Sequence, residues 1–551
     1  MSTIPLPDLL HGQERATPDH ALLEELLGLA FLGSNETARI HRNLGDAPLE
    51  TSTWDADLYA SEIFLEEFVA GFSRLRFGGR RYNAHGEFLA RVLGNPPGDL
   101  ETIRFRQEIL RELESDDDIR VHTEKLYQEL IYLLDLIKSA HTQRSVDNTP
   151  DRLRVLAQCA TVIEMMESDF GSCSSGLRRI HEAGAAIKKT RQYRILSDLL
   201  SFEDDLASVR LSMRLGADGR IKNLQIDEFE EARDNRFYKR PLTRWREMAS
   251  LFWRGYPMSA REVVNRVIVD VYLKNAPALA QVSLLVGHLE VYLTARSFAD
   301  TARQRGLDVS LAEVTETGPL RYDRLFNPLL LAQDESPVPC DLSLETSASV
   351  CVVTGPNSGG KTRLLQGVGL SQLLAQNGLY VPASSAEVPM VQGEFASLVQ
   401  SDRADQVEGR LGTELLRIRS LFEHIRPNSM VLLDELCSGT NPSEAAEIVL
   451  MVLRLLVQLS PRAFITTHFL DLARELAANG SVEATHFLQV QMEGETSTYQ
   501  FIDGVANTSM ATETARRLGV DFERLTEEIN ARLARQESAV GADSVEAGER
   551  S

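Results

Sequence analysis

The chain has 551 residues, too many for a single hydrophobic core, and its length predicts about three or four domains. Its 43% hydrophobic and 25% charged residues are those of an ordinary globular protein. A net charge of −22 excludes a surface that binds nucleic acid all over, so any such contact must be local. The acidity is equally explained by a solubilising surface.

The sequence contains no run of about 18 apolar residues and no secretory pattern over residues 1–13, so we expect a cytoplasmic protein. Its five cysteines are odd in number and show no Cys-x-x-Cys spacing, which predicts reduced thiols and neither disulfides nor a zinc site. They are Cys159, Cys173, Cys340, Cys351 and Cys437.

Residues 1–84 are expected to form an N-terminal helical segment. Apolar residues recur at three- and four-residue spacing over 21–31 and 58–72, which predicts amphipathic helices. Gly78 and Gly79 interrupt this pattern and are interpreted as a break between helical regions.

Residues 85–318 are expected to form a helical core and lever. Helical periodicity runs over 87–190 and resumes over 260–303, and Asp99 follows a Pro-Pro-Gly turn as the predicted N-cap of a new helix. Between these stretches, apolar and polar residues alternate on both sides of a glycine-containing turn, which predicts a β-hairpin over 208–227.

Two basic stretches that contain aromatic residues flank the predicted hairpin and are candidates for local phosphate contact in this acidic chain. They could also be solvated helix faces with buried aromatic residues. The basic residues proposed for this contact are Lys188, Lys189, Arg191, Arg194, Arg236, Lys239 and Arg240.

Residues 319–509 alternate strand and helix, the pattern of an α/β nucleotide-binding domain. An apolar strand there is followed by the phosphate-binding pattern G-x-x-x-x-G-K-[ST], in which glycines let backbone N–H groups surround a polyphosphate. In this pattern Lys361 reaches the β- and γ-phosphates and the Thr362 hydroxyl can ligate Mg²⁺. The predicted ATP-binding loop comprises Gly355, Pro356, Asn357, Ser358, Gly359, Gly360, Lys361 and Thr362.

Two later strands supply further candidates for the same site. The apolar run 430–433 ends in Asp434, a candidate Mg²⁺ ligand, and in Glu435, a candidate base for the attacking water. A second apolar strand, 463–467, ends in His468, which could reach the γ-phosphate or its water.

These motifs together resemble the ATPase domain of the MutS family, the ABC-type ATPases of mismatch repair and recombination control. The resemblance rests on the Gly-Pro-Asn opening at 355–357, on Leu-Tyr-Val-Pro-Ala at 379–383, on the run 433–444, on Thr-Thr-His-Phe at 466–469 and on the segment 503–509. It continues more weakly upstream, at 97–113 and 324–330, where Asn327 replaces a family histidine.

The resemblance implies ATP and Mg²⁺ as cofactors, DNA as a partner and an ATP site completed across a homodimer. It makes His468 the switch residue and residues 510–536 a helical dimerisation element, followed by a tail, 537–551, that we expect to be disordered. The loop that would cross the dimer interface comprises Ser438, Gly439, Thr440 and Asn441.

Several positions depart from the family pattern. The family places a serine and a phenylalanine ahead of a glutamate, but alignment on Glu414 puts Gly409 and Leu411 there, so a hydroxyl contact to the partner's γ-phosphate is lost. An aromatic residue that stacks on adenine is replaced by Pro337 or Val338. Tyr499, at a second stacking position, could serve as the platform.

The family's N-terminal mismatch-reading module, with its Gly-x-Phe-Tyr-Glu wedge, is not recognised in this sequence, and neither is a nuclease-like tail. We therefore expect a compact member that binds DNA without preferring mismatches. A dimeric ATP-binding interaction protein with weak hydrolysis and no direct DNA role is the main alternative. An ATPase of a membrane transporter is disfavoured by the Gly-Pro-Asn loop and the long helical first half.

Overall fold

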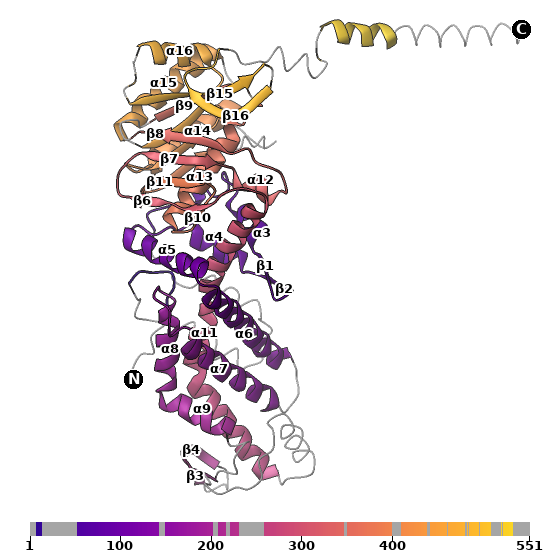
Figure 1. Cartoon of the computed structure of the whole chain (residues 1–551), viewed down its shortest axis with the longest axis vertical. Helices are drawn as coiled ribbons and strands as arrows, with labels where there is room; N and C mark the ends of the chain where they lie inside the picture. The colour runs from indigo at the N-terminus through magenta and orange to yellow at the C-terminus, as the bar shows by residue number, and fades with distance from the viewer. Residues whose placement is uncertain are drawn as a thin grey trace, which may run out of the picture. The chain divides into compact units, whose positions relative to one another are not determined.

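The computed structural model describes residues 7–13, 52–142, 149–201, 208–215, 221–230, 258–345, 350–356, 358–398, 409–437, 441–459, 461–479, 482, 484–494, 496–507, 520 and 522–532. The chain forms two compact units, whose helices and strands are labelled in Figure 1. Unit 1 comprises Met1–Glu316, Pro328–Glu335 and Leu370–Met390, and unit 2 comprises Thr317–Asn327, Ser336–Gly369 and Val391–Ser551. None of the described helices is long and apolar enough to cross a membrane.

Unit 1 is mainly helical, in keeping with the apolar periodicity of its sequence. Its helices in chain order are η1 (Ala56–Leu58), α3 (Leu65–Phe72), α4 (Gly86–Leu93), α5 (Leu100–Ser115), α6 (Asp117–Thr142), α7 (Thr149–Asp169), α8 (Arg178–Lys188), α9 (Arg191–Ser201), α11 (Met258–Gln304) and α12 (Pro328–Ala332). The predicted cap of α5 is confirmed, because the Asp99 carboxylate accepts the backbone N–H of Thr102 at 2.6 Å.

Residues 7–13 thread into the helical core of unit 1. The Arg106 guanidinium is buried and donates to the carbonyl of Leu10 at 2.9 Å and to the side-chain carbonyl of Asn377 at 2.9 Å. The hydroxyl of Tyr292 donates to the carbonyl of Leu9. These bonds satisfy the backbone of a segment without secondary structure of its own, which explains how it stays buried.

The prediction of an all-helical segment over residues 1–84 is wrong in its last part. The predicted helix over 58–72 begins only at Leu65, because Phe64 adopts a left-handed conformation with φ 59°. Strands β1 (Arg74–Phe77) and β2 (Arg80–Asn83) then form an antiparallel hairpin. The predicted helix over 21–31 lies outside the described residues.

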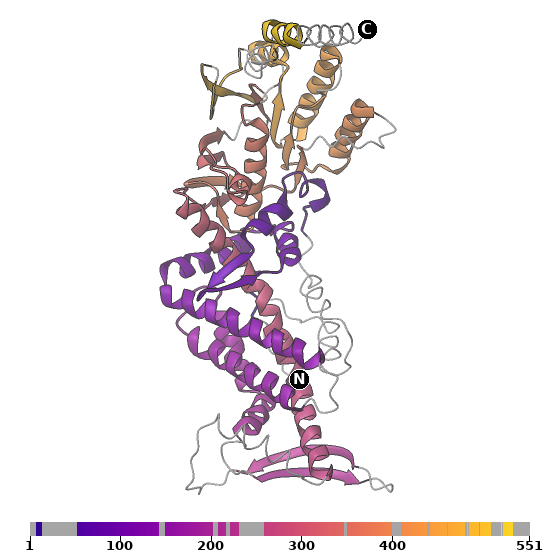
Figure 2. The ribbon, with the colours of Figure 1, turned by 90° about the vertical axis from the view of Figure 1, so that its right-hand side faces the viewer.

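The hairpin expected near residue 208 is present as β3 (Ser208–Leu215) and β4 (Ile221–Glu230), so its second strand extends beyond the predicted end at 227. Figure 2 shows it as a long two-stranded ribbon next to α11, with which β4 is in contact.

Unit 1 also contains strands that join distant parts of the sequence. Strand β5 (Ser310–Leu311) pairs with β10 (Tyr380–Val381), and β6 (Glu313–Thr315) pairs in parallel with β11 (Ser385–Pro389). The predicted domains 85–318 and 319–509 were contiguous, whereas residues 370–390 group with unit 1. Such pairing between short, distant strands has no local signal in the sequence.

Unit 2 is built on a six-stranded sheet in the order β12-β13-β14-β9-β15-β16. Its strands are β9 (Val350–Thr354), β12 (Glu394–Ser397), β13 (Met430–Leu433), β14 (Arg462–Thr467), β15 (Thr485–Glu493) and β16 (Thr496–Asp503). All are mutually parallel except β16, which is antiparallel to β15. The residues of β9, β13 and β14 are buried throughout, as their mainly apolar sequences predict. Strands β7 (Leu320–Leu325) and β8 (Cys340–Leu344) of unit 2 also pair in antiparallel orientation.

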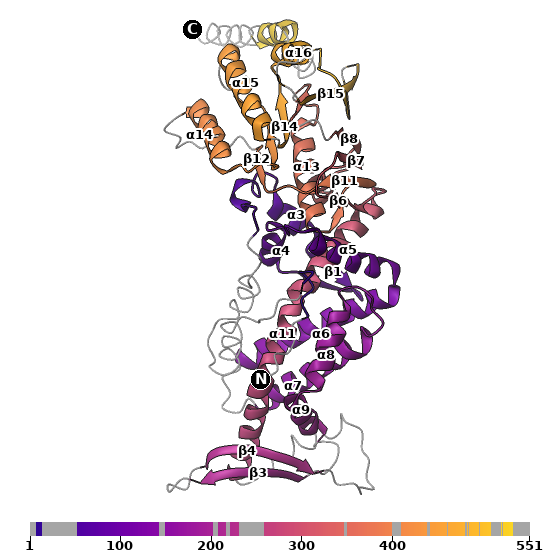
Figure 3. The same ribbon diagram turned by 90° about the vertical axis from the view of Figure 1, so that its left-hand side faces the viewer.

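Four helices accompany the sheet: α13 (Lys361–Gln376), whose first half belongs to unit 2, α14 (Gly409–His424), α15 (Pro442–Leu459) and α16 (Leu470–Asn479). Helices α15 and α16 contact β9, and Figure 3 shows α14 and α15 near β12 and β14. The α/β architecture expected for the C-terminal half is therefore present. The five cysteines are buried and free in this structure.

Candidate functional site

Three parallel strands of the unit 2 sheet end at the same edge. In the pairing of β14 with β9, Thr467 lies opposite Thr354, and in the pairing of β13 with β14, Leu433 lies opposite Ile465. The segments that follow these strands therefore emerge together. In open α/β sheets, ligands bind in the crevice at this carboxyl edge.

The segment after β9 has the conformation that its glycines permit. Gly355 and Gly360 have φ values of 144° and 87°, a region that favours glycine. A Cβ atom on Gly355 would lie 2.6 Å from Cγ2 of Val490, so the chain approaches β15 too closely for any side chain. Helix α13 begins directly after this loop, at Lys361, with its free N–H groups at the sheet edge. Asn357 lies outside the described residues.

Lys361 is buried beneath the loop. Its ammonium donates to the carbonyls of Gly355 and Pro356, each at 3.0 Å, and lies 3.7 Å from Oε1 of Glu435. Burial lowers the pKa of Lys361, while the carboxylates of Glu435 and Asp434 oppose that change. A buried cation is thus held between the loop and the acidic strand end.

Asp434 joins the start of α13 to two strands. The Thr362 hydroxyl donates to Oδ2 of Asp434 at 2.6 Å, and the Thr466 hydroxyl donates to Oδ1. The backbone N–H of Glu435 in turn donates to the Thr466 hydroxyl at 2.9 Å. The predicted residues Thr362, Asp434 and Glu435 are therefore brought together.

Thr466 is a residue of this site that the sequence analysis missed. Its side chain is fully buried in the middle of three strands, and it contacts both Asp434 and Glu435. The available signal was a polar residue near the end of a mainly apolar strand, two residues before His468. That signal did not show which neighbour the hydroxyl would contact.

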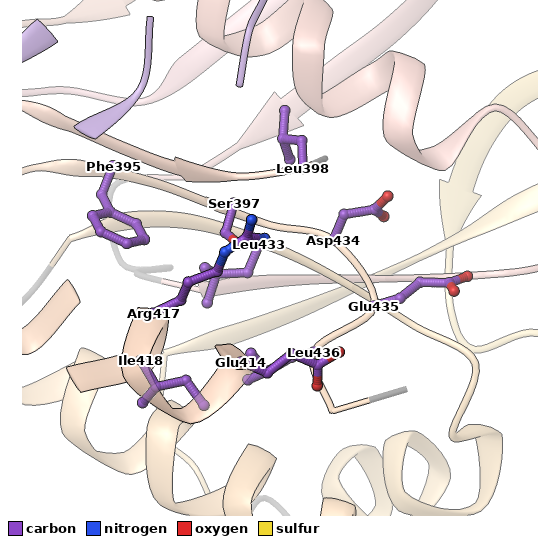
Figure 4. Close-up of a pocket in the computed structure, with 10 residues that line it drawn as sticks. All are labelled: Phe395, Ser397, Leu398, Glu414, Arg417, Ile418, Leu433, Asp434, Glu435 and Leu436. Carbon is purple, nitrogen blue, oxygen red and sulfur yellow. Dashed lines mark hydrogen bonds between the residues drawn. The ribbon is translucent and has the colours of Figure 1, made fainter. Parts of the chain in front are cut away.

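The chain after β13 is in an unusual conformation, with φ values of 47° at Glu435 and 60° at Cys437. Left-handed non-glycine residues are costly and concentrate at functional sites. A small pocket adjoins this strand end, and in it Arg417 of α14 donates to the Ser397 hydroxyl at 3.3 Å. Figure 4 shows the carboxylates of Asp434 and Glu435 on one side of the strand end and Arg417 with Ser397 on the other.

His468 and Tyr499 occupy the margins of the site. The half-buried His468 ring packs on Phe469 with centroids 4.2 Å apart and forms no hydrogen bond with the described residues. Tyr499 is 45% exposed, and a Cβ atom on Gly360 would lie 3.1 Å from its Cδ1 atom, so the ring borders the loop. Its neighbour Gln500 donates to the carbonyl of Pro339 at 2.9 Å, beside the exposed Val338.

Two further segments of the family resemblance contact the loop and its helix. The Asn327 side chain donates to the carbonyl of Arg363 at 2.9 Å, in the first turn of α13. The backbone N–H of Ala506 donates to the hydroxyl of Thr354 at 2.9 Å, directly before the loop. The segments 324–330 and 503–509 are far apart in sequence, but each contacts the phosphate loop region or the helix that follows it.

Of the predicted dimer-interface loop, Ser438, Gly439 and Thr440 lie outside the described residues. Asn441 is exposed, and its side-chain oxygen accepts the backbone N–H of Ser443 at 3.1 Å, which caps α15. In this structure, the Asn441 side chain therefore caps the N-terminus of α15.

The first basic stretch lies at the junction of α8 and α9. Lys188 forms an ion pair with Glu167 at 2.6 Å, whereas Lys189, Arg191 and Arg194 are exposed. Tyr193, the aromatic residue in this stretch, is 5% exposed, so it belongs to the core and is no stacking platform. The remaining predicted residues, Arg236, Lys239 and Arg240, lie outside the described part of the chain.

Comparison with known proteins relates the C-terminal part of this chain to one family. Residues 351–532 match the model of MutS domain V. The chain is 33% identical over 242 residues to "Endonuclease MutS2" of Geobacillus kaustophilus, covering 43% of this chain and 30% of the relative. It is 34% identical over 216 residues to "Endonuclease MutS2" of Streptococcus thermophilus, covering 38% and 26%.

A third relative, "Putative endonuclease MutS2" of Bacillus subtilis, is 31% identical over 229 residues, or 40% of this chain and 28% of that protein. The matched stretch thus spans less than a third of the length of each of these relatives. The family match at 351–532 begins in β9 and includes the phosphate loop, the acidic strand end and Thr466. Residues 351–532 are therefore identified as a MutS domain V.

Proposed function

We propose that this chain is an Mg²⁺-dependent ATPase of the MutS type, which uses ATP binding and hydrolysis to change its association with DNA in repair or recombination. The observation that carries the proposal is the Asp434 carboxylate, which accepts hydrogen bonds from Thr362 at the start of α13 and from Thr466 on β14. Phosphate loop and acidic strand thereby form one polar site at the carboxyl edge of the sheet.

The loop and Lys361 are proposed to bind the triphosphate. The N–H groups at the start of α13 face anions favourably, and the buried ammonium, now on the carbonyls of Gly355 and Pro356, is the cation that a γ-phosphate would attract. On binding, the ammonium would exchange these carbonyl partners for phosphate oxygens without leaving the loop.

The oxygen donors of this site fit Mg²⁺. Thr362 and Asp434 present a hydroxyl and a carboxylate 2.6 Å apart, the ligand types that Mg²⁺ prefers together with water and phosphate oxygens. When bound there, Mg²⁺ neutralises charge on the phosphates. Asp434 is proposed to bind Mg²⁺ at this site, and the Thr466 hydroxyl fixes the orientation of the Asp434 carboxylate.

Glu435 is proposed to accept the proton of the attacking water. Its backbone N–H is bonded to the Thr466 hydroxyl, and its carboxylate lies 3.7 Å from the Lys361 ammonium, so the carboxylate is held at the site of the phosphate loop. His468, at the end of the neighbouring strand, is proposed as the residue that senses the γ-phosphate. Tyr499, exposed beside Gly360, is proposed as the platform on which adenine stacks.

DNA association and assembly as a homodimer are proposed from the family relationship. Lys188, Lys189, Arg191 and Arg194 remain candidate phosphate contacts. Residues 522–532 form a helix whose apolar side chains Phe522 and Ile529 are 86% and 58% exposed, as suits an intermolecular helix contact. Endonuclease activity, which appears in the names of the relatives, is not part of this proposal.

A dimeric ATP-binding protein with weak hydrolysis and no DNA role is the second candidate. Helix α14 begins at Gly409, where the family has a serine hydroxyl for the partner's γ-phosphate. The net charge of −22 also disfavours extensive nucleic-acid contact.

Two substitutions separate binding from turnover. Lys361→Ala should weaken ATP binding, because the phosphate cradle loses its cation. Glu435→Gln should retain binding and lower kcat by about 10²-fold or more, because only the base is removed. Unchanged turnover in Glu435→Gln contradicts the mechanism, and a salt-dependent DNA-binding assay of the unchanged chain separates the two candidate functions.

A further inference from the structure

The β1–β2 hairpin carries four arginines in ten residues of an acidic protein. Its sequence is Arg-Leu-Arg-Phe-Gly-Gly-Arg-Arg-Tyr-Asn, from Arg74 to Asn83. Arg76 lies directly opposite Arg81 in the register, and Arg74 lies opposite Asn83. Since side chains alternate between the faces of a strand, Arg74, Arg76, Arg81 and Asn83 share one face, which we call the arginine face.

The opposite face of the hairpin anchors it to the helical core. Leu75 is fully buried, and Phe77 stacks on Tyr82 with ring centroids 6.0 Å apart. Both rings contact Tyr127 of α6 edge-on, at 6.1 and 5.8 Å. The hairpin is therefore held on a fixed platform with its arginine face directed away from it.

The arginine face does not stabilise the hairpin. All four of its residues are exposed, and like charges directly opposite each other on a sheet are destabilising. No carboxylate lies within ion-pair distance of Arg74, Arg76, Arg80 or Arg81 in the described part of the chain. Other exposed arginines do have such partners: Arg178 with Glu182, and Arg419 with Glu423.

The tip of the hairpin leaves room for a close approach. Gly78 and Gly79 have φ values of 52° and 78°, as in the two-residue type I′ turn, and a Cβ atom on either would meet nothing within 4 Å. The tip therefore presents bare backbone, with Arg80 beside it.

We propose that the β1–β2 hairpin is a contact for duplex DNA, in which Arg74, Arg76 and Arg81 bind backbone phosphates. The inference deepens the proposed DNA association and rests on it. Guanidinium groups bind phosphate through paired hydrogen bonds, and two-stranded ribbons fit the major groove. Arg74 and Arg76, two residues apart on β1, are about 7 Å apart and can reach separate phosphates, and Arg81 extends from the facing strand opposite Arg76. These contacts position a duplex and read no sequence.

The test compares two triple variants of the full chain in binding to a fluorescein-labelled duplex while sodium chloride is raised from about 50 to 200 mM. The first is Arg74→Gln, Arg76→Gln and Arg81→Gln. The second, Arg120→Gln, Arg178→Gln and Arg419→Gln, removes the same charge from arginines that have carboxylate partners. Each phosphate contact contributes about 0.9 to the slope of log K against log salt, so the hairpin variant should lose about 2.7 of that slope and the control should keep it.

Equal binding by the two variants overturns the hairpin assignment while leaving DNA association intact. Absence of duplex binding by the unchanged chain overturns the proposed DNA association together with the assignment. Binding of poly-glutamate that the hairpin variant loses, with duplex binding unchanged, identifies an acidic protein partner instead and also overturns it. Unchanged ATP binding and melting temperature in the hairpin variant exclude misfolding as the cause of any loss.

Discussion

Thr466 should control turnover without affecting ATP binding, because its hydroxyl contacts both acidic residues and neither the loop nor Lys361. It donates to Asp434 and accepts the backbone N–H of Glu435 at 2.9 Å. Thr466→Val keeps the shape of the side chain but leaves a carboxylate oxygen and an N–H group without their partner. A buried polar group left unpaired costs about 1–3 kcal/mol.

The lower end of that range applies here, because Asp434 and Glu435 are half-buried and water can replace part of the lost bonding. Two groups at roughly 1 kcal/mol each give about 2 kcal/mol. If this free energy is lost from the stabilisation of the transition state by Asp434 and Glu435, kcat decreases about 30-fold. The dissociation constant of ATP should change by less than about threefold, since the cradle is untouched.

Steady-state hydrolysis gives kcat, and titration with a fluorescent ATP analogue gives binding. Thr466→Ser retains the hydroxyl and should restore most of the activity. Thr123→Val is the matched control, because Thr123 is also fully buried and its hydroxyl donates to the carbonyl of Ile119, outside the site. An unchanged kcat in Thr466→Val, or an equal loss in Thr466→Ser, would refute the positioning role.

Two further predictions concern stability and assembly. Burial raises the pKa of Glu394 from its ordinary value of 4.5 to about 8, so stability that is present below pH 4.5 should be lost as pH rises to 8. One pKa unit corresponds to about 1.4 kcal/mol, so the free energy of unfolding of Glu394→Gln, relative to that of the wild type, should rise by up to roughly 5 kcal/mol between about pH 4.5 and pH 9. Urea unfolding measures this difference. A pH-independent difference would contradict this. Phe522→Asp with Ile529→Asp should convert a dimer to a monomer in light scattering without altering the melting temperature, whereas a persistent dimer would locate the contact elsewhere.

The parts of the site that could be predicted from sequence are those in which contiguous residues carry the chemistry. The phosphate loop, with Lys361 and Thr362, and the acidic pair at 434–435 each lie in one short motif beside an apolar strand. Their convergence follows from parallel strands ending at one edge. The cap of α5 was predictable for the same reason, since Asp99 and the N–H it accepts are three residues apart.

The features that were missed depend on pairing between strands. The contacts of Thr466 arise because β13 and β14 are neighbours in register, which no local pattern reveals. The β1–β2 hairpin was read as a break in a helical region because each strand has four residues, too few for a clear period of two. Residues 370–390 join unit 1 through pairing of β10 and β11 with strands some 70 residues earlier.

The net charge of −22 and the arginine face act on DNA over different distances. At physiological ionic strength, exposed charges are screened beyond about 8 Å, so acidic residues elsewhere on the surface barely change the potential at Arg76 and Arg81. The electrostatic potential that a phosphate experiences there is set by the nearest groups. Within the described residues, these arginines form no ion pair. Net charge influences long-range attraction, and it would slow the approach of DNA, most at low salt. The association rate and the salt slope of the equilibrium should therefore respond differently. Removing distant carboxylates should accelerate binding and leave the slope unchanged, whereas neutralising the arginine face should lower the slope itself.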